Sequence, residues 1–156
     1  MMPDSSGDSG RSRAGAGMND AMSSMRRRAP CVVLVAEDHD DTRIAERIVL
    51  EAFGFVVKEA RTGLDALAIA QVSRPRIVLI DLVLPEIDGP QLARMLRADP
   101  TTRSAALLAV SASSNPEARQ AALSAGCDDF VAKPVPPLCL VRMIRRHIRK
   151  EPSLGL

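Results

Sequence analysis

Five short apolar runs, rich in β-branched residues, recur along the chain and alternate with segments of helical character. Runs of this kind are typical of strands that are buried on both faces of a parallel sheet. Strict alternation of strands and helices predicts a doubly wound α/β domain, because right-handed crossovers place helices on both faces of the sheet. The predicted strands are residues 31–36, 55–60, 76–80, 105–110 and 129–132.

Five helices are expected between and after these strands. Thr62, Asp88 and Asn115 each precede a helical segment and are residue types that accept hydrogen bonds from a first helical turn. Because the chain has three Phe and no Trp or Tyr, the core is expected to be aliphatic. The apolar faces predicted for the first two helices are Ala45, Ile48, Val49, Ala52 and Phe53, and then Leu64, Leu67, Ala68 and Val72.

The two ends of the chain differ in composition from its middle. Residues 1–29 are rich in Ser, Gly and Arg and are expected to form a disordered tail, while residues 30–150 form the domain and 151–156 a short C-terminal tail. The net charge of +2 is too small to require a nucleic-acid partner, and no run is apolar enough to span a bilayer. We therefore expect a cytoplasmic protein without direct DNA or membrane binding.

Three cysteines and two histidines stand apart from any obvious metal motif. Cys31, Cys127 and Cys139 lie in or beside apolar segments without a C-x-x-C pair, so buried reduced thiols are expected. His39 and His147 are each interpreted as solvent-exposed side chains rather than as ligands.

Polar side chains follow four of the five predicted strands. Glu37 and Asp38 follow the first strand, Asp81 the third, Ser111 the fourth and Lys133 the fifth. The carboxyl ends of parallel strands meet at one edge of a sheet, where ligands bind in folds of this kind. Three converging carboxylates repel one another, and a hard cation such as Mg²⁺ converts that repulsion into binding. A metal beside a carboxylate nucleophile suits phosphoryl transfer, with Asp81 as the acceptor.

Four motifs in this order resemble the receiver domain of bacterial two-component response regulators over residues 31–149. They are "VLVAEDHDD", "IVLIDLVLPEIDG", "LLAVSAS" and "DFVAKP". The resemblance implies a flavodoxin-like sheet of strand order 2-1-3-4-5 with five helices. It also implies a phosphoprotein that takes a phosphoryl group from a sensor histidine kinase or a histidine phosphotransfer protein, using Mg²⁺. The chain is most similar to stand-alone regulators of the chemotaxis kind, which act by binding a downstream protein.

The resemblance also implies a role for each matching residue. Asp81 is the expected phosphoacceptor, Lys133 the phosphate-binding lysine before a cis Pro134, and Ser111 the switch hydroxyl. Phe130 falls at the position of the switch aromatic. The implied metal ligands are Glu37, Asp38, Asp81 and the backbone carbonyl of Val83.

The chain departs from the usual family pattern at several of these positions. Glu37 is one methylene longer than the more common Asp, Ser111 replaces Thr, and Phe130 lacks a phenolic hydroxyl. Val83 cannot orient an attacking water, so slow hydrolysis of a phosphoaspartate is expected.

Two other functions remain open from the sequence. One is an adaptor that works without phosphorylation, and the other is a small phosphatase with an aspartyl nucleophile, although Val83 stands where such enzymes carry a second Asp. The leading interpretation is a signalling domain rather than an enzyme with its own substrate. A basic stripe on the last helix is either a solvated face or a partner surface: Arg142, Arg145, Arg146, Arg149 and Lys150.

Overall fold

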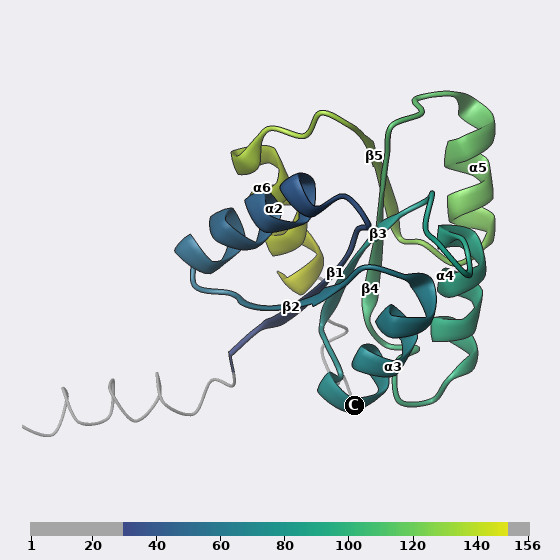
Figure 1. The fold of residues 1–156 in the computed structure, drawn as a ribbon, viewed down its shortest axis with the longest axis horizontal. Helices are drawn as coiled ribbons and strands as arrows, with labels where there is room; N and C mark the ends of the chain where they lie inside the picture. Colours follow the sequence, from purple (N-terminus) through teal and green to yellow (C-terminus); the bar gives the residue numbers. More distant parts are fainter. Residues whose placement is uncertain (1–29, 150–156) are drawn as a thin grey trace, which may run out of the picture.

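The predicted α/β architecture is confirmed by a computed structural model, which describes residues 30–149. Five parallel strands form one sheet in the order β2-β1-β3-β4-β5 (Figure 1). Their bounds are β1 Val32–Ala36, β2 Val56–Ala60, β3 Ile77–Asp81, β4 Ala106–Ser111 and β5 Asp129–Ala132. The expectations for the tails at 1–29 and 151–156, and for Lys150, lie outside the described residues.

Each strand is followed by a helix, and side chains at the helix starts explain three of the boundaries. The helices are α2 Asp40–Ala52, α3 Gly63–Ser73, α4 Gly89–Ala98, α5 Pro116–Ser124 and α6 Pro137–Arg149. Thr62 accepts a hydrogen bond from the Asp65 backbone N–H at 3.1 Å, which caps α3. Asp88 caps α4 and Asn115 caps α5 in the same way, at 2.8 and 2.7 Å. These are the capping residues that the sequence predicts.

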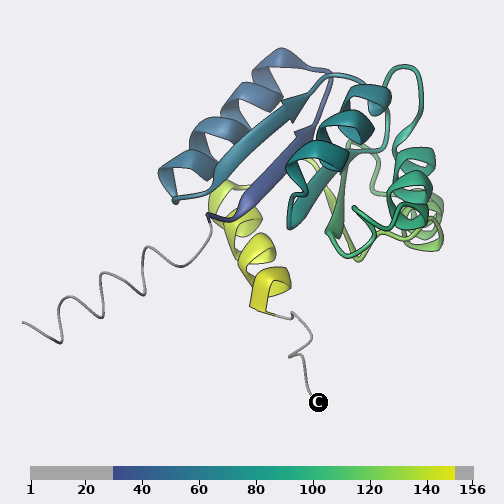
Figure 2. The same cartoon turned by 90° about the horizontal axis from the view of Figure 1, so that it is seen from below.

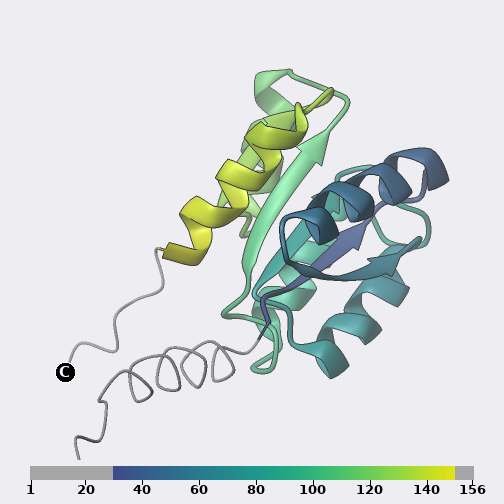
Figure 3. The same cartoon turned by 90° about the vertical axis from the view of Figure 1, so that its left-hand side faces the viewer.

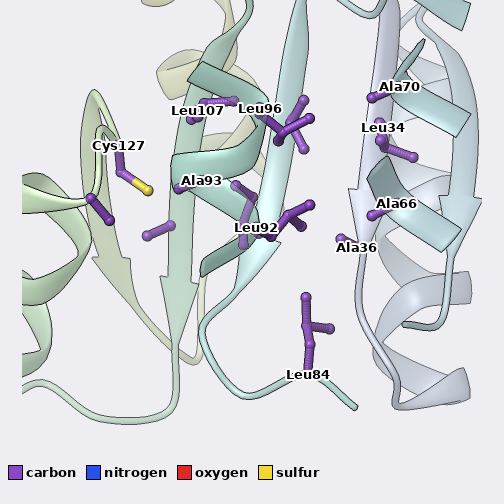
Figure 4. Packing of buried hydrophobic residues seen from close by; sticks show 14 of the residues in the cluster. Leu34, Ala36, Ala66, Ala70, Leu84, Leu92, Ala93, Leu96, Leu107 and Cys127 are labelled. Carbon is purple, nitrogen blue, oxygen red and sulfur yellow. The ribbon is translucent and has the colours of Figure 1, made fainter. Parts of the chain in front are cut away.

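The helices form two layers that cover opposite faces of the sheet. α3, α4 and α5 lie on one side, and α2 and α6 lie on the other (Figures 1 and 2). Alternate strand residues serve the two layers: Leu34 and Leu107 pack in the α3–α5 core (Figure 4), whereas Val35 and Leu108 pack with α2 and α6. Figure 3 shows α6 and α2 on their shared face. The buried sheet therefore leaves its carboxyl-end edge as the natural place for polar groups.

The predicted inward face of α3 is largely wrong, since Leu67 is partly buried against the core but Leu64, Ala68 and Val72 are exposed. Ala66 and Ala70 are fully buried, whereas Leu64 is exposed and Val72 is 87% exposed. The helix is apolar on nearly every side, so its periodicity does not identify the inward face. The small methyl groups let α3 lie close to the sheet, beside Leu34 and Ala36 (Figure 4).

The predicted apolar face of α2 is also largely solvent-exposed. The buried side chains of this helix are Arg43 and Leu50, while Ile48 is 57% exposed and Phe53 is exposed at the helix end. Val49 is partly buried against the α2–α6 core. The side of α2 that carries Arg43 faces the interior, because the Arg43 guanidinium has polar partners at the end of the sheet.

Two further expectations need correction. Cys127 is buried, but Cys31 is only half-buried and Cys139 is exposed, and none of the three forms a disulfide bond within the described residues. His147 is mostly buried rather than solvated, because Asp129 contacts its Nε2 at 3.1 Å. Burial raises the pKa of the Cys127 thiol to about 11, so this thiol is unreactive at neutral pH.

Within residues 30–149, none of the helices has both the length and the apolar character needed to cross a membrane.

Candidate functional site

Strand pairing brings the predicted site residues to one edge of the sheet. In the paired strands Ala36 lies opposite Ile80, so Glu37 and Asp81 follow neighbouring residues at the ends of β1 and β3. Ser111 lies opposite Ala132 at the ends of β4 and β5, directly before Lys133. The backbone N–H of Lys133 donates to the Ser111 carbonyl at 2.7 Å, which continues the strand pairing to the site.

Lys133 joins the two buried carboxylates of this edge. Its Nζ donates to Glu37 Oε2 at 2.5 Å and to Asp81 Oδ2 at 3.1 Å. Only 2% of the Glu37 side chain and 7% of the Asp81 side chain are exposed to solvent. A buried carboxylate is costly unless it is paired, so the ammonium group is what allows both acids to sit at the end of an apolar sheet.

The pKa values of the three groups respond to this arrangement. Burial, together with the nearby charge of Glu37, raises the pKa of Asp81 against the opposing effects of Lys133 and the Val83 N–H. Burial also opposes ionisation of Glu37, but hydrogen bonds from Lys133 and the His39 N–H outweigh it and lower the pKa of Glu37. Burial disfavours the Lys133 ammonium, yet its two carboxylate partners raise the pKa of Lys133. Asp81 is thus the acid that gains most from a further positive charge.

Asp81 is held rigidly at both carboxylate oxygens. While Oδ2 accepts from Lys133, Oδ1 accepts a hydrogen bond from the Val83 backbone N–H at 3.0 Å. The start of α4 also lies close to the backbone of Asp81. A Cβ added to Gly89 would lie 2.6 Å from the Asp81 carbonyl oxygen. Glycine is therefore required where the helix meets the strand end.

Four side chains at this edge are arranged to hold a cation. Glu37, Asp38, His39 and Asp81 each offer a ligand atom, and these atoms all lie within 4.8 Å of one another. Asp38 Oδ1 is shielded from solvent and accepts no hydrogen bond within residues 30–149. Carboxylate oxygens are the ligands that Mg²⁺ prefers, so the three carboxylates of this set fit the metal that the sequence predicts.

The side chains of Ser111, Val83 and Phe130 make no hydrogen bond to Glu37, Asp38, Asp81 or Lys133 within the described residues, although the Val83 backbone N–H does. The Ser111 hydroxyl oxygen accepts from the Ser113 backbone N–H at 3.1 Å, and no hydrogen bond links it to Asp81 or Lys133 within the described residues. The Val83 side chain points away from the core and is 75% exposed. Phe130 is partly buried against the α3–α5 core. The peptide bond between Lys133 and Pro134 is cis, as the resemblance implies.

Sequence reasoning missed two charged residues of α2 that face the site. The Arg43 guanidinium donates to the Glu37 carbonyl at 3.1 Å and pairs with Asp40 and Glu59, so it ties α2 to the ends of β1 and β2. Its spacing of three residues from Asp40 was the available signal. Burial, and then the charge of Glu37, raise the pKa of Glu46 to about 7. Its position between the apolar residues Ala45 and Val49 gave no such signal.

A groove of about 580 Å³ opens beside Lys133, between α2 and the segment that joins β5 to α6. Its walls are mostly apolar, and Glu46 is among the few residues with a polar side chain that line it. The groove is lined by Asp41, Thr42, Ala45, Glu46, Val49, Ala112, Lys133, Pro134, Val135, Pro137 and Leu140. The side of α2 that the sequence predicts to be apolar therefore faces this groove in part, through Ala45 and Val49.

Known proteins are similar to this chain in both sequence and fold. Residues 33–145 match the family described as response regulator receiver domain. A 14.6 kDa protein from the sodA1 3′ region of Leptolyngbya boryana is 35% identical over 74% of this chain and 88% of its own length. The transcriptional regulatory protein CseB of Streptomyces coelicolor is 36% identical over 79% of this chain, which spans about half (51%) of CseB.

A solved structure adds a metal to the comparison. The receiver domain of the sensor histidine kinase PA1611 from Pseudomonas aeruginosa is 29% identical, with a TM-score of 0.74 over 78% of this chain and 100% of that one. Its description reports a magnesium ion coordinated in the active-site cleft. With the match over residues 33–145, this likeness of sequence and fold leads to one conclusion. The chain belongs to the response regulator receiver domain family, whose members are signalling domains of two-component systems.

Proposed function

We propose that Asp81 accepts a phosphoryl group and that this modification changes the binding of a protein partner. The observation that carries the proposal is the position of Lys133, whose ammonium group contacts both Asp81 and Glu37. An ammonium next to a buried nucleophilic carboxylate is suited to pair with the oxygens of an incoming phosphoryl group. Residues 30–150 form the accepting domain in this proposal.

The phosphoryl group comes from a phosphohistidine on a sensor histidine kinase or a histidine phosphotransfer protein. A carboxylate oxygen of Asp81 forms the new O–P bond as the N–P bond of the donor breaks, and the bonding electron pair stays on the leaving imidazole nitrogen. The Val83 N–H and Lys133 fix the carboxylate for this attack. The chemistry acts on the protein itself, so the domain needs no separate substrate.

Mg²⁺ is the proposed cofactor, held by Glu37, Asp38, Asp81 and the Val83 carbonyl. When bound, the ion neutralises charge on the transferred group. Asp38 is the direct ligand best prepared for this role, because its Oδ1 is shielded and accepts no hydrogen bond within the described part of the chain. Glu37 is already engaged by Lys133 and by His39, so Lys133 must leave Glu37 at least in part to reach a phosphoryl oxygen.

Ser111 and Phe130 are the proposed links from the phosphoryl group to the partner surface. Ser111 is buried at the end of β4, and its hydroxyl proton has no acceptor within residues 30–149. It is therefore able to donate a hydrogen bond to a phosphoryl oxygen. Movement of Ser111 would alter the packing around Phe130 on the neighbouring strand, since Ala109 pairs with Phe130 in the sheet.

The groove beside Lys133 is the proposed approach for the phosphodonor. It has mostly apolar walls, lies next to the Lys133 side chain and opens along α2, where Ile48 is exposed. A helix of the donor that carries the phosphohistidine would bury these apolar side chains as it brings the phosphoryl group to Asp81. The downstream partner is proposed to be a protein that distinguishes the phosphorylated domain from the unmodified one.

Beryllofluoride binding tests the site itself. This ion mimics a phosphoryl group on a carboxylate, so amide resonances of Asp81, Ser111 and Lys133 should shift in two-dimensional NMR when it is added with Mg²⁺. Asp81→Asn should abolish these shifts, whereas Asp65→Asn, on the exposed start of α3, should leave them unchanged. Shifts that persist in Asp81→Asn, or that do not need Mg²⁺, would refute the proposed site. A folded wild type that shows no shifts would refute the proposal and favour an adaptor that works without phosphorylation.

A further inference from the structure

His39 follows the acidic pair directly, and its side chain turns back over that pair. It occupies the position before the first turn of α2, but its ring makes no capping hydrogen bond to the helix. Instead, Nδ1 lies 3.1 Å from Glu37 Oε1 and 3.2 Å from Asp38 Oδ1. The ring is 75% exposed, so this position is not imposed by packing.

The contact between His39 Nδ1 and Glu37 Oε1 is a hydrogen bond, and the distances from Nδ1 to the two carboxylate oxygens are also those of neighbouring ligands around one metal ion. Neighbouring ligands of an octahedral ion with bonds of about 2.1 Å lie about 3.0 Å apart. In a tetrahedral zinc site with bonds of about 2.0 Å they lie about 3.3 Å apart. The distances from Nδ1 to the two carboxylate oxygens fall between these values. An ion could therefore enter between the three atoms with little movement of the side chains.

One oxygen atom of Asp38 lacks a hydrogen bond, which supports binding of a metal ion at this position. Asp38 Oδ1 is shielded from solvent and has no hydrogen bond within residues 30–149, although His39 Nδ1 lies 3.2 Å from it. A buried carboxylate oxygen without a partner is destabilising. A shared cation would satisfy Asp38 Oδ1, Glu37 Oε1 and the imidazole nitrogen together.

We infer that His39 is a fourth side-chain ligand of the metal beside the three carboxylates, so that the site prefers a divalent transition ion such as Zn²⁺ or Co²⁺ over Mg²⁺. Imidazole nitrogen suits these ions, whereas Mg²⁺ favours oxygen ligands and keeps several of its waters. The inference rests on the proposed function in using the same metal site, and it adds a preference that three carboxylates alone do not supply. Nucleophilic attack still belongs to Asp81.

Metal titration of the full chain tests the role of His39. Binding of Co²⁺ and Mg²⁺ is measured by calorimetry for the wild type, His39→Asn and His147→Asn. The control removes the other of the two histidines, which lies on α6 against Asp129. His39→Asn should weaken Co²⁺ binding by about tenfold or more and change Mg²⁺ binding by less than about twofold. His147→Asn should change neither.

Two further measurements locate the ion. In the Co²⁺ complex, a hyperfine-shifted imidazole N–H proton should be seen by NMR in the wild type and in His147→Asn, and it should be absent in His39→Asn. Asp38→Asn should weaken both ions, because it removes a ligand that they share. Equal weakening of Co²⁺ and Mg²⁺ by His39→Asn, or an imidazole signal that survives this substitution, would overturn the inference.

The same samples separate this inference from the proposed function. One outcome is that His39→Asn leaves Co²⁺ binding unchanged and the wild type still binds beryllofluoride in the presence of Mg²⁺. In that case the assignment of His39 is overturned and the phosphoryl site stands. If the wild type binds Co²⁺ with loss in His39→Asn but takes no beryllofluoride, the metal assignment stands and the proposed function is refuted.

Discussion

Glu46 lies on α2 and lines the groove beside Lys133. Its surroundings are unfavourable for a negative charge, since burial and the charge of Glu37 raise its pKa from 4.5 to about 7. Between these two values the folded state binds more protons at Glu46 than the unfolded state does. The stability of the protein therefore falls as the pH rises through this window.

Glu46→Gln should remove this pH dependence. The amide stays neutral, so the variant should be more stable than the wild type at pH 8 by about 1 to 2 kcal/mol, with the full effect of the shift reduced by partial solvent exposure. At pH 4, where Glu46 is largely protonated in both the folded and the unfolded state, the difference in stability should nearly vanish. Urea unfolding followed by circular dichroism measures the free energy of unfolding at each pH. A constant difference between the two proteins would contradict this account.

Val83 is the residue that bears on the lifetime of a phosphoaspartate. Its side chain is apolar and exposed beside Asp81, so it offers no group to orient an attacking water. We expect the phosphoryl group to persist for minutes or longer on the purified protein, measured as the decay of the phosphorylated mass. Val83→Asn should shorten the half-life by about tenfold, because an amide can position water. Val72→Asn, at another exposed position, serves as the control. A wild-type half-life of seconds would show that Val83 does not limit hydrolysis.

The elements show where sequence patterns were sufficient. Capping by Thr62, Asp88 and Asn115 followed from local chemistry, and the structure confirms it. The strand ends were predicted to within one residue, since β3 and β4 extend to Asp81 and Ser111. The inward faces of α2 and α3 could not be predicted in this way. Apolar residues lie on nearly every side of α3, and α2 buries the side chain of Arg43. Which residue of an apolar helix faces the sheet depends on how closely the helix approaches it, and this is set by tertiary packing.

Paired substitutions in α3 test the corrected face. Ala70→Leu should destabilise the protein by about 2 kcal/mol, because the side chain has no room between the helix and the sheet. Val72→Ala should be neutral or slightly stabilising, by up to about 0.5 kcal/mol, since Val72 is exposed and Ala favours a helix. The free energy of unfolding in urea distinguishes the two. The reverse order would restore the face that the sequence suggested.

At the scale of the whole molecule, the site depends on four strands that are far apart in the sequence. The polar residues at the ends of β3 and β4 and directly after β1 and β5 were predictable because parallel strands end at one edge. The bridge made by Lys133, the position of the His39 ring and the environment of Glu46 were not, since each depends on side-chain orientation between separate elements. One arginine of the basic stripe on α6 also contacts an aromatic ring. The Arg145 guanidinium lies 5.5 Å from the centre of the Phe53 ring.

Phosphorylation of Asp81 is the central claim, and intact-mass spectrometry tests it most directly. The wild type, Asp81→Asn and the control Asp65→Asn are incubated with acetyl phosphate and Mg²⁺, and the modified peptide is then mapped. The account predicts a gain of one phosphoryl group in the wild type and in Asp65→Asn, located within residues 77–89, and no gain in Asp81→Asn. A folded wild type that gains nothing, or an equal gain in Asp81→Asn, would contradict it.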